Sequence, residues 1–262
     1  MQQTFTDQLS RKIVLADSPL RIISLVPSQT ELLFDLGLDH CIIGVTKFCI
    51  HPAVLVKDKI KVGGTKKLRI DLIRSLKPDL IIGNKEENER SQIEALMEEF
   101  PVWMSDIANL QEALDMIKGI GKLTKTQDRA RAITLEIEQQ FKSLLPITKP
   151  LRVIYLIWQE PYIAAGQGTF INDMLQWCGF INTIEQERYP NVSADDLQRA
   201  NPDVILLSSE PYPFKQKHIA EFTAMIPKAR VILVDGEMFS WYGSRMLLAA
   251  RYFENLIAKL NE

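Results

Sequence analysis

The chain has few cysteines, no long apolar run and no excess of either charge. Its three cysteines, Cys41, Cys49 and Cys178, are an odd number at wide spacing. They describe neither a disulfide framework nor a zinc ribbon, and they fit a reducing compartment slightly better. The longest apolar runs, such as Val153–Trp158, fall far short of the ~20 residues of a membrane span. With a formal net charge of -2, nothing suggests a nucleic-acid binder, which usually carries a basic face. We therefore expect neither a nucleic-acid partner nor membrane insertion.

The first residues also lack a secretory signal. Met1–Asp7 reads MQQTFTD, without a basic start followed by an apolar stretch. From this segment alone we expect either a cytoplasmic protein, if the chain as given is complete, or a mature chain whose signal has been removed.

What the sequence does contain is an alternation of short β-rich runs and helical patterns. With 262 residues and 46% hydrophobic content, the chain can bury a core in one large or two small domains. Buried strands are predicted at residues 21–26, 41–45, 80–82, 102–104, 152–158, 204–207 and 231–234. Helices are predicted at residues 29–36, 71–76, 91–99, 169–178, 195–200 and 245–260. Ser28 is the expected N-cap of the first helix, with Glu31 as its capping-box partner. The alternation predicts an α/β fold with parallel sheets.

A longer helical pattern runs from about residue 124 to residue 145. Apolar residues recur there at spacings of three and four, which is one face of a helix: Ala130, Ile133, Ile137, Phe141 and Leu144. We expect two Rossmann-like lobes, residues 1–120 and 148–262, joined by a single long helix within residues 121–147. Asp71–Ile82 also resembles Asp195–Leu206. This repeat reflects either two similar lobes or the general likeness of βαβ units.

Charged and aromatic residues gather in the segments that follow the predicted strands. In open parallel sheets, ligands bind beyond the carboxyl ends of the strands. Aromatic rings would be costly to leave exposed there without a purpose, and rings with a polar edge suit a partly flat, partly hydrogen-bonding ligand. We therefore expect a ligand site in a cleft between the lobes. The candidate contacts in these segments are Lys47, Cys49, His51, Trp158, Tyr212, Trp241 and Tyr242.

Signatures of catalysis and metal binding are weak. Cys49 and His51 lie two apart and could reach one soft metal from an extended segment, or they could be ordinary loop residues. Gly166–Thr169 precedes a helix but lacks the lysine of a P-loop. Neither GxSxG nor HExxH occurs, and no GxGxxG follows a strand. We expect no catalytic residue, no dedicated metal site and no covalently bound cofactor.

Several motifs together resemble a known family. Arg21–Glu31 (RIISLVPSQTE), Lys61–Gly64 (KVGG), Leu76–Ile82 (LKPDLII) and Asn201–Ile205 (NPDVI) look like class III periplasmic substrate-binding proteins. These proteins are also called helical-backbone metal receptors, and they include carriers of vitamin B12, siderophores and haem. The resemblance covers nearly the whole chain and is closest to the cobalamin-binding branch.

The resemblance implies a periplasmic, non-catalytic protein that delivers a corrinoid or a metal chelate to an ABC transporter permease. Family members dock through one acidic residue on each lobe, and by motif position these are Glu89 and Asp195. Tyr162, Tyr189 and Arg245 fall where the cobalamin binder places ligand contacts. Thr65 and Asn84 stand where that binder has tryptophans. We expect the protein to be a monomer.

Two other functions remain open at this point. The charged strand-end segments, including the acidic pair Glu86 and Glu87, and the missing signal favour a cytoplasmic enzyme or small-molecule sensor on the same scaffold. A structural interaction module is the third possibility, and the polar strand-end segments do not especially favour it.

Overall fold

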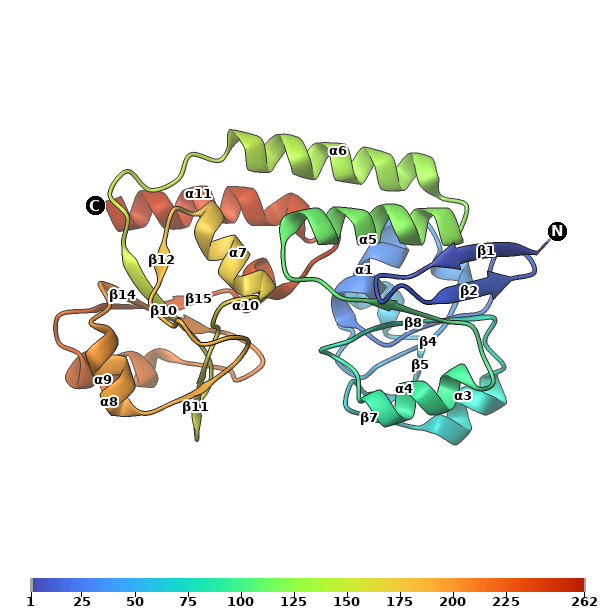
Figure 1. Cartoon of the computed structure of the whole chain (residues 1–262), viewed down its shortest axis with the longest axis horizontal. Coiled ribbons are helices and arrows are strands. Elements are labelled where there is room, and N and C mark those ends of the chain that lie inside the picture. Colours follow the sequence, from blue (N-terminus) through green and yellow to red (C-terminus); the bar gives the residue numbers. More distant parts are fainter. Residues whose placement is uncertain (1, 262) are drawn as a thin grey trace. The chain divides into compact units, whose positions relative to one another are not determined.

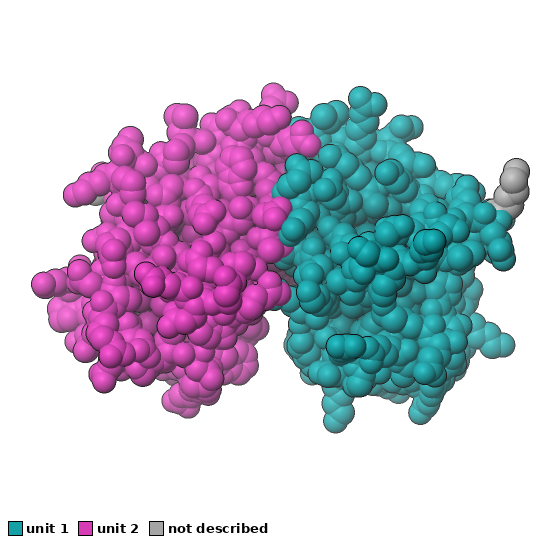
Figure 2. All heavy atoms as spheres, in the orientation of Figure 1, with its two compact units in different colours: residues 1–107, 111–136, 242–245 teal, residues 108–110, 137–241, 246–262 magenta. Residues whose placement is uncertain are grey.

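Every apolar run that was predicted to be a strand is one. The computed structural model describes residues 2–261 as a mixed α/β protein with two units, coloured separately in Figure 2. Unit 1 comprises the residues up to 107, then 111–136 and 242–245. Unit 2 comprises residues 108–110, 137–241 and those from 246 onward. The expected α/β class with parallel sheets is confirmed.

Unit 1 contains a parallel sheet with strand order β5-β4-β3-β8-β9. The strands are β3 (Ile22–Ser24), β4 (Ile42–Val45), β5 (Ile60–Lys61), β8 (Leu80–Asn84) and β9 (Val102–Ser105). Strand β3, the first of this sheet in the sequence, is central. The next two strands, β4 and β5, lie on one side of it, and β8 and β9 lie on the other. The carboxyl ends of β3 and β8 therefore flank the point where the strand order reverses, the usual ligand position in such sheets.

Helices cover both faces of this sheet (Figure 1). The helices of unit 1 are α1 (Pro27–Asp35), η1 (Asp39–Cys41), α2 (Ala53–Val56), α3 (Ile70–Leu76), α4 (Arg90–Met97) and α5 (Leu110–Leu123). Helices α3 and α4 bury Ile73, Ile93 and Leu96 against one face. Two antiparallel hairpins complete the unit: β1 (Gln3–Thr6) with β2 (Lys12–Leu15), and β6 (Gly63–Gly64) with β7 (Lys67–Leu68).

The expected cap of α1 is wrong. Helix α1 begins at Pro27, with Val26 as its N-cap and no side-chain cap hydrogen bond. Proline suits the first helical position because its fixed φ is helical and its missing N–H would be unpaired there anyway. Ser28 is therefore already inside the helix and buried, and Glu31 is available for another partner.

Unit 2 contains a sheet with strand order β13-β11-β10-β14-β15, with β12 also paired to β10. Its strands are β10 (Arg152–Trp158), β11 (Tyr162–Ala164), β12 (Ile181–Asn182), β13 (Asn191–Val192), β14 (Val204–Ser208) and β15 (Arg230–Val234). Its helices are α7 (Phe170–Trp177), α8 (Ala194–Ala200), α9 (Gln216–Met225), α10 (Gly236–Ser240) and α11 (Met246–Asn261). Strands β10, β14 and β15 are parallel, so their carboxyl ends meet at one edge.

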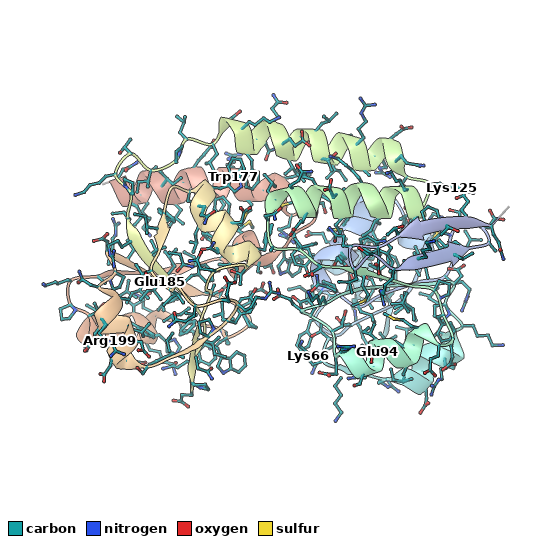
Figure 3. The ribbon with its side chains drawn as sticks, in the orientation of Figure 1. Lys66, Glu94, Lys125, Trp177, Glu185 and Arg199 are labelled. Atoms are coloured by element: carbon teal, nitrogen blue, oxygen red, sulfur yellow. The ribbon has the colours of Figure 1, made fainter. Side chains whose placement is uncertain are left out.

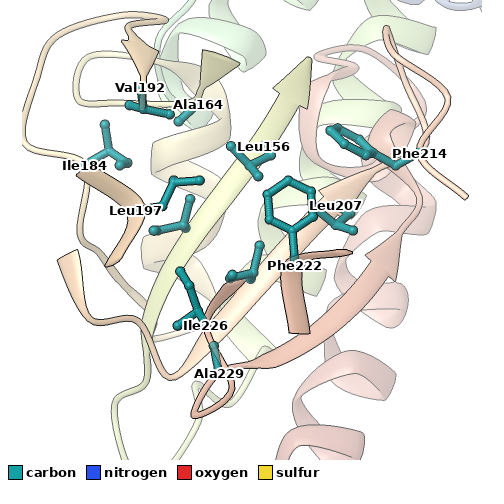
Figure 4. Packing of buried hydrophobic residues seen from close by; sticks show 12 residues of the cluster. Leu156, Ala164, Ile184, Val192, Leu197, Leu207, Phe214, Phe222, Ile226 and Ala229 are labelled. Carbon is teal, nitrogen blue, oxygen red and sulfur yellow. The ribbon is translucent and has the colours of Figure 1, made fainter. Parts of the chain in front are cut away.

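One face of this sheet carries a core under α8 and α9 (Figure 4). Alternate strand residues such as Ile154 and Ile205 meet Leu197 and Phe222 there. On the other face the ring of Tyr155 lies 5.1 Å from that of Phe239. A sheet buried on both faces explains why these strands read as continuous apolar runs.

The sequence repeat corresponds to one structural unit that occurs twice. Lys77 and Asn201, which end α3 and α8, have φ of 45° and 44°. Just beyond them, Asp79 accepts the backbone N–H of Arg21 (2.9 Å), and Asp203 accepts that of Arg152 (2.8 Å). The side chain of each arginine donates to the last carbonyls of the helix in its own unit. The likeness therefore extends beyond that of two ordinary βαβ units.

The predicted long helix is α6 (Gln127–Ser143), and the boundary between the units falls inside it. The assignment of residues 1–120, 121–147 and 148–262 as separate domains stays a prediction.

The three cysteines are free and buried. Within residues 2–261, none of the helices combines the length and the apolar character that crossing a bilayer requires.

Replacing Phe222 with Ala should cost about 3–5 kcal/mol of unfolding free energy, because the ring is fully buried in the unit 2 core and leaves a cavity. Urea unfolding followed by circular dichroism measures this loss. The neighbouring exposed Thr223→Ala is the control and should change stability by less than about 0.5 kcal/mol. Equal effects of the two substitutions would contradict the packing.

Candidate functional site

A buried polar cluster of Ser24, Thr30, Thr46 and Cys49 lies at the carboxyl edge of the unit 1 sheet. The Thr30 hydroxyl lies 2.7 Å from Ser24 Oγ and 3.1 Å from Cys49 Sγ. Thr46 Oγ1 lies 3.2 Å from the same sulfur. Burial raises the pKa of Cys49, so the group remains a thiol rather than the thiolate that binds soft metals. This placement favours the interpretation of Cys49 as an ordinary loop residue.

His51 is half-buried and lies near Glu31, where burial raises the pKa of the carboxyl and the His51 ring slightly opposes the rise. Among the described residues 2–261, no three His, Cys, Asp or Glu side chains gather as metal ligands. Lys47 is exposed and lies over the Phe48 ring, with Nζ 4.9 Å from the centroid. Of the predicted contacts on this segment, Lys47 is the one that presents its charge at the surface.

Asn84, at the end of β8, shapes a loop. The side chain is buried, its Nδ2 donates to Ser105 Oγ (2.9 Å), and its Oδ1 accepts the backbone N–H groups of Glu86 and Glu87. Thr65 is half-buried, and its carbonyl accepts from Asn88 Nδ2 (3.2 Å). Asn84 and Thr65 thus fix the loop that follows β8.

Arg245 forms a two-point ion pair with Glu31. Arg245 Nη2 and Nε donate to the two carboxylate oxygens at 2.6 and 3.0 Å, and both side chains are largely buried. Burial raises the pKa of Glu31, although Arg245 opposes the rise. Next to the pair, Ser244 Oγ donates to Asp35. These contacts attach residues 242–245, which include the predicted contact Tyr242, to α1 within unit 1.

The carboxyl edge of the unit 2 sheet carries a connected set of aromatic rings. Trp158 ends β10 and packs edge-on against Tyr212, with ring centroids 5.6 Å apart. The Tyr212 ring also packs against Phe214 and His218. Because His218 Nδ1 accepts the Lys215 N–H (2.7 Å), a neutral His218 carries its proton on Nε2, which faces the Tyr212 hydroxyl.

Hydrogen bonds fix these rings in place. Tyr212 donates its hydroxyl proton to Gln159 Oε1 (3.0 Å), and Gln159 Nε2 donates to Glu221. Tyr162 donates to Glu221 Oε1 (2.8 Å), and burial raises the pKa of Tyr162 to about 12. Trp158, Tyr162 and Tyr212 are candidate contacts from the sequence, whereas Gln159 and Glu221, which link them, are not among the candidates. Nothing in the sequence spacing indicates that Glu221, on α9, would reach β10.

A half-buried carboxylate, that of Glu210, also belongs to unit 2. Glu210 Oε1 accepts from Trp241 Nε1 and Ser240 Oγ, both at 2.8 Å. Burial raises the pKa of Glu210. The predicted contact Trp241 is itself buried, so its indole holds Glu210 in position.

The remaining predicted contact, Tyr189, is half-buried in the segment between β12 and β13. A hollow of about 420 Å³ also lies in unit 2 and contains none of the predicted ligand contacts. Its lining residues are Thr183, Ile184, Glu185, Gln186, Val192, Asp196, Arg199 and Ala200.

The two acidic residues expected to dock on a permease are both exposed at helix starts. Glu89 is the N-cap residue of α4, without a side-chain cap bond. Asp195 lies in the first turn of α8, where Ser193 and Asp196 form the capping box. Asp195 is therefore not needed to cap this helix, and its side chain is exposed.

Comparison with known proteins establishes the family. The model of the periplasmic binding protein family matches residues 22–227, and the chain belongs to that family. The family consists of substrate-binding proteins, which are not enzymes. The predicted non-catalytic binding function is therefore confirmed, and the enzyme alternative is wrong. Binding proteins of this family act in the periplasm, take small-molecule ligands and work with ABC transporter permeases.

Individual relatives agree with this result. The vitamin B12-binding protein of Pectobacterium atrosepticum is 25% identical over 253 residues, which cover 92% of this chain and 90% of the relative. The periplasmic vitamin B12-binding protein BtuF of Vibrio cholerae is 23% identical, with a TM-score of 0.75 over 93% of this chain and 98% of that chain. A periplasmic heme-binding protein from Pseudomonas aeruginosa is 20% identical, with a TM-score of 0.79 over 91% and 92%. The two structures share the fold.

Arg245→Met should cost about 3–5 kcal/mol at pH 8, because it leaves the Glu31 carboxylate buried without a partner. The folded state then binds a proton at Glu31 more tightly than the unfolded state does. The loss should therefore be smaller at pH 5 and grow as the pH rises through the raised pKa. Urea unfolding at both pH values measures the difference.

The double variant Glu31→Gln/Arg245→Met is the matched control. It removes both charges, so it should recover most of the lost stability and show little dependence on pH at this site. If the two single substitutions simply add, the pair is not coupled in the way that its geometry requires.

Proposed function

We propose that this chain is the periplasmic substrate-binding protein of an ABC importer for a corrinoid or an iron chelate. The proposed ligand site consists of contacts, and of buried side chains that support them, in segments at or after the strands of each unit. In unit 2 these are Trp158, Tyr162, Tyr189, Tyr212 and Trp241, and in unit 1 they are Lys47, Cys49, His51, Thr65, Asn84, Tyr242 and Arg245. Three of these residues are buried and act through the groups they bind: Cys49 through Thr30 and Thr46, Asn84 through the backbone of residues 86–87, and Trp241 through Glu210.

The observation that carries this proposal is the fixed aromatic surface at the end of β10. Trp158 is 39% exposed, although it is a large ring packed against Tyr212. The bonds from Tyr212 to Gln159 and from Gln159 to Glu221 restrain the rings before any ligand arrives. A restrained ring loses little entropy on binding, and its face attracts flat, polarisable ligands.

The charges at these edges are compatible with a ligand that is large and only partly polar. Arg245 is neutralised by Glu31, and Lys85 by Asp106 (2.6 Å), while Lys47 remains exposed. Relatives are named for vitamin B12 and heme, both of which contain a metal-bearing macrocycle with polar groups at its rim. This match supports a macrocyclic metal chelate as the first ligand class to test.

A ligand panel tests the proposal directly. Cyanocobalamin, haem and a ferric siderophore, each added at about 100 times its Kd, should stabilise the protein by about 2.7 kcal/mol if bound. Thermal unfolding screens the panel, and titration calorimetry then measures the Kd. With the ligand that binds, Trp158→Ala should weaken binding by about ten- to a hundred-fold, because the exposed ring face is lost.

Trp177→Ala is the control, because Trp177 packs against Phe141 (5.5 Å), away from the strand ends of its unit. It should lower stability and leave the Kd unchanged. A panel in which no compound shifts the unfolding temperature would refute the ligand class. A Trp158→Ala variant with the affinity of the native protein would refute the aromatic surface as the contact.

Docking to the permease is the second part of the proposal. Glu89 and Asp195 are exposed at helix starts and are not needed as caps, so each can pair with an arginine of a partner. We expect Glu89→Arg and Asp195→Arg to leave the ligand Kd unchanged and to lower ligand-stimulated ATP hydrolysis by the reconstituted transporter at least about ten-fold. Glu254→Arg, a charge reversal on the exposed side of α11, should have no effect. Full stimulation by both docking variants would contradict these roles.

A further inference from the structure

One segment of unit 1 departs from the charge balance of the chain. Residues 47–69 contain seven Lys and Arg residues against a single acidic residue, Asp58, whereas the whole chain has a net charge of -2. The basic residues are Lys47, Lys57, Lys59, Lys61, Lys66, Lys67 and Arg69. We call this segment, residues 47–69, the basic strip.

The basic strip also exposes apolar side chains. Val54 on α2 is 80% exposed, and Ile50 and Leu55 next to it are also exposed. A single exposed apolar residue is ordinary, but several within one short stretch among lysines indicate a surface that binds a protein or a membrane. Basic residues interleaved with apolar ones are the pattern of segments that lie on anionic membrane surfaces.

Protection of the sheet edge explains only part of the basic strip. Strand β5 is at the edge of the sheet, and lysines beside an edge strand prevent pairing with another chain. Lys59 and Lys61 fit this role, because their ammonium groups donate to the carbonyls of Asp39 and Val56. The role does not account for Lys57 and Lys67, which are exposed, or for Val54 and Leu55.

The basic strip is continuous with the start of α4, where Glu89 lies. Gln92 on α4 accepts the Leu68 N–H (2.7 Å) and donates to the Lys66 carbonyl (2.9 Å). Lys66 Nζ donates to the Glu86 carbonyl (2.5 Å), and Figure 3 shows Lys66 beside α4. If Glu89 meets a permease, the hairpin of β6 and β7 beside it lies close to the membrane that holds the permease.

We propose that the exposed part of the basic strip outside the ligand site contacts anionic lipid headgroups around the permease, with Lys57 and Lys67 on the phosphates and Val54 and Leu55 at the interface. The inference rests on the proposed docking through Glu89. Lipid contact confines the binding protein to the membrane plane, which raises its encounter rate with the transporter.

The test is flotation of the full chain with vesicles, without permease or ligand. Vesicles with roughly one third phosphatidylglycerol in phosphatidylcholine should bind the protein at about 0.05 M salt and release most of it at about 0.5 M. Vesicles of phosphatidylcholine alone should bind little. Lys57→Glu/Lys67→Glu should lower partitioning at least about five-fold per lysine, and Val54→Ser/Leu55→Ser should lower it on the same vesicles.

The controls change charge and apolar surface elsewhere. Lys149→Glu/Lys228→Glu makes the same charge change at exposed positions of unit 2, and Leu145→Ser removes another exposed apolar side chain. Neither should alter vesicle binding. Equal binding to neutral vesicles, or equal loss in the controls, would overturn the lipid contact.

A different partner is also distinguishable. The native chain could fail to bind both kinds of vesicle while Lys57→Glu/Lys67→Glu weakens binding to detergent-solubilised permease. In that case the basic strip contacts a protein, and the lipid proposal fails. Ligand binding is measured separately on the same variants and should be unchanged. Failure of the ligand panel with intact vesicle binding would therefore count against the proposed function alone.

Discussion

The register of each parallel sheet depends on the same interaction, made once per unit. An arginine at the start of one strand, or just before it, donates to the last carbonyls of the helix that precedes the neighbouring strand. An aspartate three residues beyond that helix accepts the backbone N–H of the same arginine. This contact sets Ile22 opposite Leu80 and Val153 opposite Val204. Because the paired parallel strands start in register, the carboxyl ends of β3 and β8 lie at the same edge of their sheet. The carboxyl ends of β10 and β14 likewise share one edge. The placement of Asn84, Trp158 and Tyr212 follows from that register.

The elements that sequence reasoning predicted are those whose signal is local. Continuous apolar runs identified the buried strands, and a proline or glycine ended most of the predicted helices. Helix α5 was missed because Gly119 and Gly121 interrupt its pattern. Gly121 is there for packing, since a Cβ would lie 2.5 Å from the Cβ of Ala130. The N-cap of α1 was wrong because Pro27, and not Ser28, sets where that helix begins. In both cases a contact or a backbone preference outweighed the pattern.

The sequence predicts the strand-end segments as the candidate site, but it does not predict how the charges within them pair. Glu31 and Arg245 are far apart in the sequence, and no spacing indicates that they bind each other. The apparent excess of charge at these edges is largely internal: Lys85 pairs with Asp106, and Glu210 accepts bonds from Ser240 and Trp241. The candidate site has many charged residues in the sequence, but most of these charges are neutralised within the fold. Such a site agrees better with a bulky chelate than with a small ion.

The four residues from Tyr242 to Arg245 belong to unit 1, although the chain on either side of them belongs to unit 2. No single cut in the polypeptide can therefore separate the units cleanly. A fragment ending at residue 136 would keep Glu31 and lose the arginine that neutralises it. A fragment beginning at residue 137 would carry those four residues without the α1 surface on which they rest. Expression of isolated halves should yield poorly soluble pieces, and rearranged chains with new termini in exposed loops are the better route to studying each unit.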